Sequence, residues 1–118
     1  MANVAILMGS ESDRSVMKAT EDVLDQMGVD YETHVISAHR NPEQLMKYVT
    51  SADEKGIKVF IAGAGGAAAL PGAIASWTSL PVIGVPVASS ELKGIDALYA
   101  IVQMPPGIPV AGVAVGSW

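Results

Sequence analysis

The sequence predicts an α/β protein, a three-layer α/β/α sandwich with a five-stranded parallel sheet at its centre. Short apolar runs alternate along the chain with segments of helical period, and each run ends in a cluster of small residues. This alternation is typical of parallel strands joined by helices. Most of the runs also lack charged side chains, which indicates a sheet covered on both faces. Right-handed crossovers then give an open, doubly wound sheet.

The first part of the chain predicts a strand, a helix and a second strand. Residues 4–8 form the first strand, and the helix that follows it ends at Gly28. The buried face of this helix should consist of side chains three or four residues apart: Val16, Met17, Thr20, Val23, Leu24 and Met27. Residues 31–36 form the second strand.

Three residues mark the start of the next helix. Asn41 can cap it, Pro42 suits the first turn, and the Gln44 amide can reach back to the helix start. The helix should end at Gly56 and bury four side chains: Leu45, Met46, Val49 and Ala52.

The rest of the chain predicts three more strands and two shorter helices. The strands cover residues 59–62, 82–87 and 110–115, and the helices cover residues 70–78 and 94–103. The last helix should bury the side chains that recur at helical spacing: Ile95, Leu98, Ile101 and Val102. Five strands with helices on both faces correspond best to a flavodoxin-like arrangement.

Composition restricts the class of protein. A length of 118 residues suits a single α/β domain, residues 1–118. The absence of cysteine excludes disulfides and zinc–thiolate sites, and no export signal is visible, so we expect a cytoplasmic protein. A net charge of -5 argues against a protein that binds nucleic acid over a broad surface.

Charged residues are distributed very unevenly. Residues 1–58 carry ten acidic and six basic side chains, whereas residues 59–118 carry only Glu91, Lys93 and Asp96. The glycines and prolines in the uncharged stretch argue against a membrane-spanning helix. Because a small domain cannot bury so much uncharged surface internally, we expect other copies of the chain to cover part of it in a homo-oligomer.

Ligands of open parallel sheets bind beyond the carboxyl ends of the strands. Three loops at that edge stand out, at residues 9–13, 37–42 and 63–68. In the first loop, free backbone N–H groups at a helix start favour an anion such as phosphate, and Ser10 and Ser12 add hydroxyl donors. The alternative is that Ser12 or Asp13 only caps the helix.

The second loop places an imidazole next to a guanidinium. Arg40 can bind a phosphate or carboxylate through two parallel hydrogen bonds, and His39 is suited to proton transfer near neutral pH. The alternative is a surface pair without a role. The other histidine, His34, lies inside a predicted strand and is interpreted as structural.

The third loop matches the pattern G-x-G-x-x-A at residues 63–68. A dinucleotide site is a weak interpretation, because that fingerprint normally follows the first strand and this loop follows the third. The glycines can let a ligand approach the backbone, or they can serve a tight turn and helix packing. The pattern is compatible with both roles, ligand binding and a tight turn with helix packing.

Five segments together resemble the N5-carboxyaminoimidazole ribonucleotide mutase family, the catalytic subunit family of phosphoribosylaminoimidazole carboxylase. The resemblance covers essentially the whole chain, and the order and spacing of the segments make it specific. The segments are MGSESD at 8–13, SAHRNPE at 37–43, AGAGGAA at 62–68, LPVIGVPV at 80–87 and VQMPPGIPV at 102–110.

The resemblance implies an isomerase of purine biosynthesis that moves a carboxylate within a phosphorylated ribotide. It implies a flavodoxin-like subunit in a homo-octamer, with sites shared between neighbouring subunits and with no metal or other cofactor. By motif position, His39 would be the catalytic acid and base, Arg40 would hold the phosphate, and Ser10 and Asp13 would hold the ribose phosphate. Weaker candidates for the same pocket are Ser12, Ser37 and the backbone around Gly65.

The chain departs from the family pattern in two places. Family members usually have a histidine at the position of Ala69. They also continue past the fifth strand into C-terminal helices that pack on neighbouring subunits, so we expect the chain to lack these helices.

Three alternative functions stay open at this point. The first is direct carboxylation of aminoimidazole ribonucleotide with CO2 on the same fold. The second is a nucleotide- or flavin-binding module without catalysis, which the glycine loop alone would support. The third is an inactive structural homologue, which Ala69 would favour.

Overall fold

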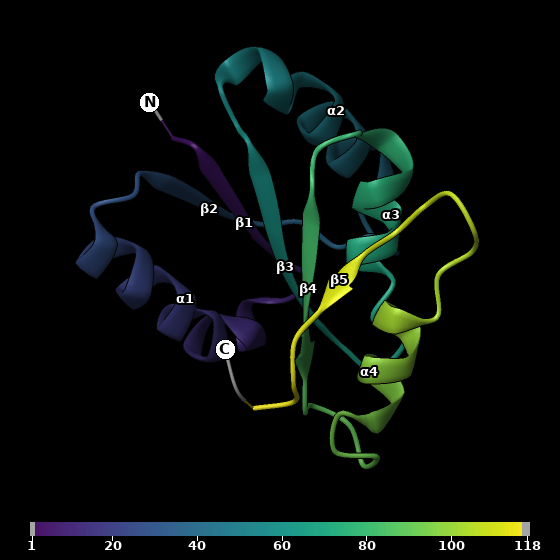
Figure 1. The fold of residues 1–118 in the computed structure, drawn as a ribbon. Coiled ribbons are helices and arrows are strands. Elements are labelled where there is room, and N and C mark those ends of the chain that lie inside the picture. Colours follow the sequence, from purple (N-terminus) through teal and green to yellow (C-terminus); the bar gives the residue numbers. More distant parts are fainter. Residues whose placement is uncertain (1, 117–118) are drawn as a thin grey trace.

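The computed structural model describes residues 2–116, and its centre is a sheet of five parallel strands (Figure 1). Their spatial order is β2-β1-β3-β4-β5, and every pairing between neighbours is parallel. This arrangement confirms the predicted doubly wound sheet. The strands are β1 (Val4–Met8), β2 (Tyr31–Val35), β3 (Val59–Gly65), β4 (Val82–Val87) and β5 (Ala111–Gly112).

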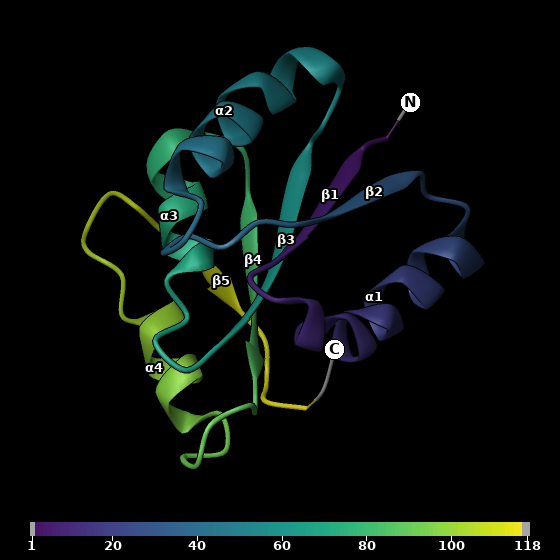
Figure 2. The ribbon, with the colours of Figure 1, turned by 180° about the vertical axis from the view of Figure 1, so that it is seen from behind.

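Four helices cover the two faces of the sheet unequally. Helix α1 lies alone on one face, and α2, α3 and α4 lie on the other (Figures 1 and 2). This makes three layers, as predicted. The helices are α1 (Arg14–Met27), α2 (Pro42–Ala52), α3 (Leu70–Trp77) and α4 (Ile95–Val102). None of the helices in residues 2–116 is long and apolar enough to cross a membrane.

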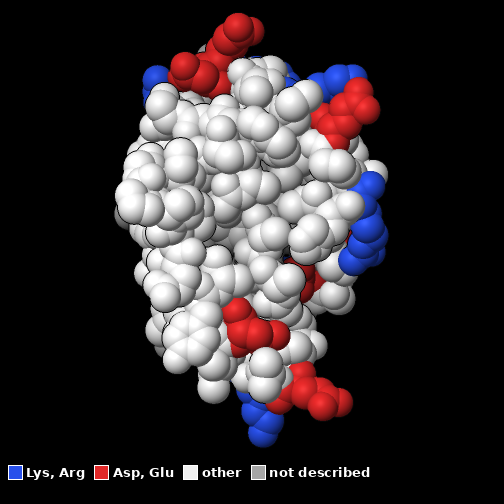
Figure 3. Space-filling model, turned by 90° about the vertical axis from the view of Figure 1, so that its right-hand side faces the viewer, with Lys and Arg blue, Asp and Glu red and all other residues white. Residues whose placement is uncertain are grey.

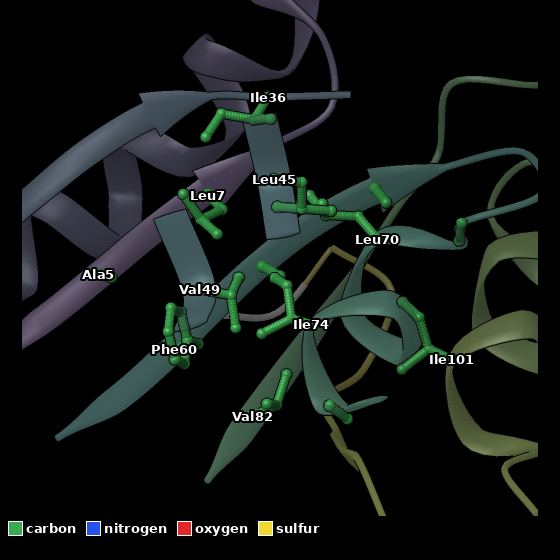
Figure 4. Packing of buried hydrophobic residues seen from close by; sticks show 14 of the residues in the cluster. Ala5, Leu7, Ile36, Leu45, Val49, Phe60, Leu70, Ile74, Val82 and Ile101 are labelled. Atoms are coloured by element: carbon green, nitrogen blue, oxygen red, sulfur yellow. The ribbon is translucent and has the colours of Figure 1, made fainter. Parts of the chain in front are cut away.

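The main hydrophobic core lies between the sheet and helices α2 to α4. Phe60 and Leu7 contribute from the strands, and Leu45, Ile74 and Ile101 contribute one side chain from each helix (Figure 4). All five are fully buried. A smaller cluster around Met17 joins α1 to the opposite face. The larger cluster therefore holds α2 and α3 in place, and with them the loops at which these helices begin.

Two strand predictions and one helix end were wrong. Strand β3 continues to Gly65, three residues beyond the predicted end, because its last residues pair with β4 as far as Val87. Strand β5 has only two residues, both exposed, at the edge of the sheet. Helix α2 ends at Ala52, and a 3₁₀ turn covers the remaining residues before Gly56.

The predicted buried face of α4 was only partly right, because Ile101 is buried as expected but two of the other side chains are not. Ile95 and Val102 are 56% and 44% exposed, whereas Ala97 and Ile101 are buried. The cause lies in β4, where Gly84 has no side chain and Ile101 packs into the space that a Cβ atom would need. This close approach of Ile101 fixes the rotation of the helix and turns Ile95 and Val102 outward.

The faces predicted for α1 and α2 are only partly buried. Val23 and Met27 at the end of α1 are exposed, and Met17 near its start is buried. In α2, Met46 was predicted to be buried but is exposed. Leu45, Val49 and Ala52 are buried and already fill the contact with the sheet.

Candidate active site

The three loops singled out in the sequence meet in one cavity of about 340 Å³ at the carboxyl ends of β1 to β4. A volume of this size suits a small ligand. The cavity is lined by all seven residues that the sequence nominated: Ser10, Ser12, Asp13, Ser37, His39, Arg40 and Gly65. Parallel strands bring them together, because their carboxyl ends lie at the same edge of the sheet.

The first loop is organised by Ser10. Its side chain accepts a hydrogen bond from the backbone N–H of Ser12 at 3.3 Å and caps the short 3₁₀ helix at Glu11–Asp13. The two serine hydroxyls also lie 3.0 Å apart. The alternative that Ser12 or Asp13 caps the helix was therefore wrong, because Asp13 makes no capping hydrogen bond at the start of α1. Two hydroxyls and a helix start face the cavity together.

Asp13 is the one buried acidic residue of this loop, with 5% of its surface exposed. Burial raises the pKa of its carboxyl above the ordinary value, and a hydrogen bond with the backbone of Ser10 opposes part of this effect. When folding raises the pKa of an acid, the fold favours its protonated form. The resulting stabilisation is complete below the pKa of the acid in the unfolded chain, and it is lost as the pH rises through the pKa of the acid in the folded protein. At neutral pH the ionised Asp13 therefore lowers stability.

We expect Asp13→Asn to raise the melting temperature at pH 7 by on the order of 2 °C, because the amide removes the cost of a buried charge. The gain should vanish below about pH 3, where the carboxyl is protonated in the unfolded chain as well as in the fold. Thermal denaturation followed by circular dichroism measures both values. Glu54→Gln, at an exposed acidic residue, is the matched control and should leave the melting temperature unchanged at both pH values. A lower melting temperature for Asp13→Asn at pH 7 would contradict this account.

The second loop is held by Ser37. Its Oγ accepts a hydrogen bond from the backbone N–H of Arg40 at 3.1 Å, and the carbonyl of Ser37 accepts one from the N–H of Asn41 at 2.9 Å. Asn41 stands at the N-cap position of α2 without a side-chain capping bond, and Pro42 occupies the first turn. The turn presents His39 and Arg40 at the cavity, both exposed.

The Arg40 guanidinium is available to a ligand, since no ion pair or hydrogen bond engages it within residues 2–116. Arg40 is the one cationic side chain in a cavity wall that also carries hydroxyls. An exposed guanidinium beside hydroxyls and a helix start is suited to phosphate. Within the described residues no group of three or more His, Cys, Asp or Glu side chains is placed to hold a metal ion.

His34 lies outside this cavity. Its Nε2 is 2.9 Å from a carboxylate oxygen of Glu32, and its ring lies against Tyr48. Hydrogen bonds from the Tyr48 hydroxyl and His34 lower the pKa of Glu32, while burial raises the pKa of Tyr48. The group joins β2 to α2 and leaves His39 as the histidine of the cavity.

The glycine segment is mainly a packing device. Gly65 ends β3, and a Cβ atom at that position would overlap the Oγ of Ser89 and lie 3.0 Å from the carbonyl oxygen of Val87. Gly66 adopts a left-handed conformation, with φ of 59°, where the chain turns. Turn and packing thus account for both glycines, although Gly65 still lines the cavity.

Sequence reasoning missed Ser89. It lines the cavity from the loop that follows β4, the fourth strand to contribute to the wall. The rule that ligands bind beyond the carboxyl ends of strands also applies to the fourth strand, so position alone could have nominated it.

Comparison with known proteins places the chain in a family. The sequence profile described as AIR carboxylase matches residues 3–118. The chain belongs to the AIR carboxylase family. Among its relatives, the N5-carboxyaminoimidazole ribonucleotide mutase of Thermotoga maritima is 56% identical over 117 residues, 99% of this chain and 68% of the relative. The protein of the same name from Vibrio parahaemolyticus is 62% identical over 113 residues, 96% of this chain and 70% of the relative.

Two solved structures share the fold. Treponema denticola PurE superimposes with a TM-score of 0.85 at 31% identity, over 93% of this chain and 70% of that one. A variant of PurE2 from the same organism gives the same score at 30% identity, over 93% and 69% of the two chains. In this member of the family, Ala69 and its methyl group line the cavity just before α3.

Proposed function

We propose that this protein is an isomerase that converts N5-carboxyaminoimidazole ribonucleotide to 4-carboxy-5-aminoimidazole ribonucleotide in de novo purine biosynthesis. The observation that carries the proposal is the single cavity in which His39 and Arg40 face the two hydroxyls of the first loop. The mutase names of relatives that are 56% and 62% identical support the same reaction.

Arg40, Ser10 and Ser12 are assigned to the phosphate end of the substrate. A phosphate carries charge that a guanidinium, hydroxyls and a helix start can all stabilise. Asp13, beside them, is assigned to the ribose, whose hydroxyls can donate to its carboxylate. Ser37 uses its oxygen to accept the Arg40 N–H, which leaves its own proton free for a ligand. With the phosphate fixed there, the base of the ribotide extends into the rest of the cavity.

His39 is assigned to both proton transfers. The bond between the carbamate carbon and nitrogen breaks, CO2 is released, and the nitrogen takes a proton from the imidazolium. The neighbouring ring carbon then bonds to the CO2 with the electron pair that the amine makes available. His39 removes the proton from that carbon and returns to its starting state. The small Ala- and Gly-lined wall keeps the CO2 beside the ring during the exchange.

A direct carboxylase is the second candidate, favoured by the name of the family itself. The two functions differ in the substrate that is consumed. Purified protein should be given the carbamate ribotide and, separately, aminoimidazole ribotide with bicarbonate, and the carbon-carboxylated product should be followed by absorbance. Rapid conversion of the carbamate alone supports the mutase. Conversion of aminoimidazole ribotide alone would replace it with the carboxylase, and a lack of both would leave a non-catalytic homologue.

We also propose a cytoplasmic homo-octamer. The absence of cysteine is compatible with a reducing compartment. The face formed by α3, α4 and the chain near β5 shows few charged side chains (Figure 3). Helix α4 exposes three apolar side chains, Ile95, Tyr99 and Val102, and Leu92 in the turn before it is also exposed. A face with few charges and several exposed apolar side chains is typical of an interface, and a second copy of the chain is the partner expected there.

Light scattering at micromolar concentration should give a multimer for the parent protein. Ile95→Glu should lower the mass, because the new carboxylate would be buried without a partner in the contact. Met27→Glu is the control, since Met27 is 70% exposed but lies on α1, on the opposite face of the sheet. A monomeric parent, or the same mass for the parent and Ile95→Glu, would rule out this interface.

A further inference from the structure

Ser89 lines the cavity but has no part in the phosphate, ribose or proton-transfer roles. It follows β4 by two residues, and its backbone N–H donates to the carbonyl oxygen of Val87 at 2.9 Å. This tight turn brings its hydroxyl against the backbone of Gly65 on the neighbouring strand, in the space that a Cβ atom would fill. Gly65 therefore lets the Ser89 hydroxyl reach the cavity wall.

The Ser89 hydroxyl has no hydrogen-bond partner among the described residues. Within residues 2–116 the Ser89 Oγ makes no hydrogen bond, whereas the hydroxyls of Ser10, Ser12 and Ser37 are each engaged. A hydroxyl offers one donor and two acceptor positions. Those of Ser89 are free to meet a ligand.

The surrounding wall is otherwise apolar. The residues that line the cavity from the end of β3 to the start of α3 are Ala64, Gly65, Ala68, Ala69 and Leu70, and none of them has a polar side chain. Ser89 is therefore the sole polar side chain on the part of the described cavity formed after β3 and β4. The charged and hydroxyl groups assigned to the phosphate and ribose lie on the other two loops, so the base of the ribotide faces this wall.

We infer that the Ser89 hydroxyl donates a hydrogen bond to the carboxylate carried by the base of the ribotide. The inference rests on the proposed function and names the group that holds the migrating carboxylate. A carboxylate against an apolar wall loses water on that side, so a hydrogen-bond donor from the wall favours its binding there. Ala69 has only a methyl group and cannot supply it. Ser89 then binds the carboxylate before and after its transfer, and its exposed position leaves the hydroxyl accessible to the ligand.

The test compares two ribotides that differ by one carboxylate. Calorimetry should measure the binding of 4-carboxy-5-aminoimidazole ribonucleotide and of 5-aminoimidazole ribonucleotide to the parent and to Ser89→Ala. We expect Ser89→Ala to weaken binding of the carboxylated ribotide by about tenfold, because this ligand uses the hydroxyl. The affinity for 5-aminoimidazole ribonucleotide, which lacks the carboxylate, should stay within about twofold of the parental value. Ser89→Thr keeps the hydroxyl and should restore the preference.

Two results would overturn the inference. One is an unchanged affinity of Ser89→Ala for the carboxylated ribotide. The other is an equal loss for both ribotides, which would mean that Ser89 only shapes the cavity. Because both measurements are equilibrium binding, they stand apart from the proposed reaction, which fails instead if the parent does not turn over the carbamate ribotide.

Turnover gives an independent check through Ala69→His. If Ser89 supplies the donor that Ala69 lacks, an imidazole at position 69 should raise turnover more in the Ser89→Ala background than in the parent. The two substitutions should thus be non-additive, as expected for groups that serve the same ligand. Equal effects of Ala69→His in the two backgrounds would contradict a shared role.

Discussion

Replacing His39 with Asn is expected to lower turnover of the carbamate ribotide by about two to four orders of magnitude, the usual loss when a general acid and base is removed. Binding should change little, because Asn keeps a polar side chain of similar reach and the phosphate contacts come from Arg40 and Ser10. The measurement is steady-state turnover together with calorimetric binding of the carboxylated product. A fall in turnover without a fall in affinity would identify His39 as a group that acts in the reaction.

The other histidine provides the matched control. His34→Asn removes an imidazole from β2, outside the cavity, and should leave turnover within about twofold. If His39→Asn kept near-parental turnover, the proton-transfer role would be wrong. If His34→Asn lost as much activity as His39→Asn, the loss would reflect damage to the fold.

Arg40→Ala is expected to weaken ribotide binding by about tenfold to a hundredfold, the effect of losing one charge-assisted contact with a phosphate. The guanidinium has no partner among the described residues, so its removal should leave no unpaired group behind. Calorimetry with ribose 5-phosphate isolates this contact from the chemistry of the base. Added salt should reduce the parental affinity more than that of Arg40→Ala, because it screens the guanidinium.

Arg14→Ala is the control for Arg40. Arg14 is the other arginine of the chain, and its guanidinium binds the Glu11 carboxylate, with Nε 2.6 Å from Oε1. This exposed pair should contribute little, and its removal should leave ribose 5-phosphate binding unchanged within about twofold. Equal affinity of Arg40→Ala and the parent for ribose 5-phosphate would refute the phosphate assignment.

The sequence was sufficient for the fold because strand and helix patterns have different periods. The uncharged run 82–87 predicted β4 with its observed bounds, and the stripe that ends at Gly28 predicted α1. The errors came from contacts between elements. The rotation of α4 depends on the missing side chain of Gly84, and this pairing of positions far apart in the chain has no local signal.

The site could be predicted in outline for a related reason. Residues 10, 39 and 65 each lie at or just beyond the end of a strand, and the geometry of parallel sheets places such positions together. What the sequence could not reveal is which hydroxyls are already engaged. Ser10 binds the Ser12 N–H, Ser37 binds the Arg40 N–H, and the Ser89 hydroxyl lies against Gly65, which is far from it in the chain.

The cavity has a consequence for how the protein acquires activity as it folds. Its walls come from four chain segments, and each belongs to a different strand of an all-parallel sheet. Two parallel strands can pair only after the segment that connects them has folded back across the sheet. For β1 and β3 the paired residues are more than fifty positions apart in the chain. No single chain segment supplies even half of the residues that line the cavity. During refolding, ligand binding should therefore return only when the sheet is complete. The activity recovered should then be proportional to the fraction of fully folded molecules, with no contribution from partly folded ones.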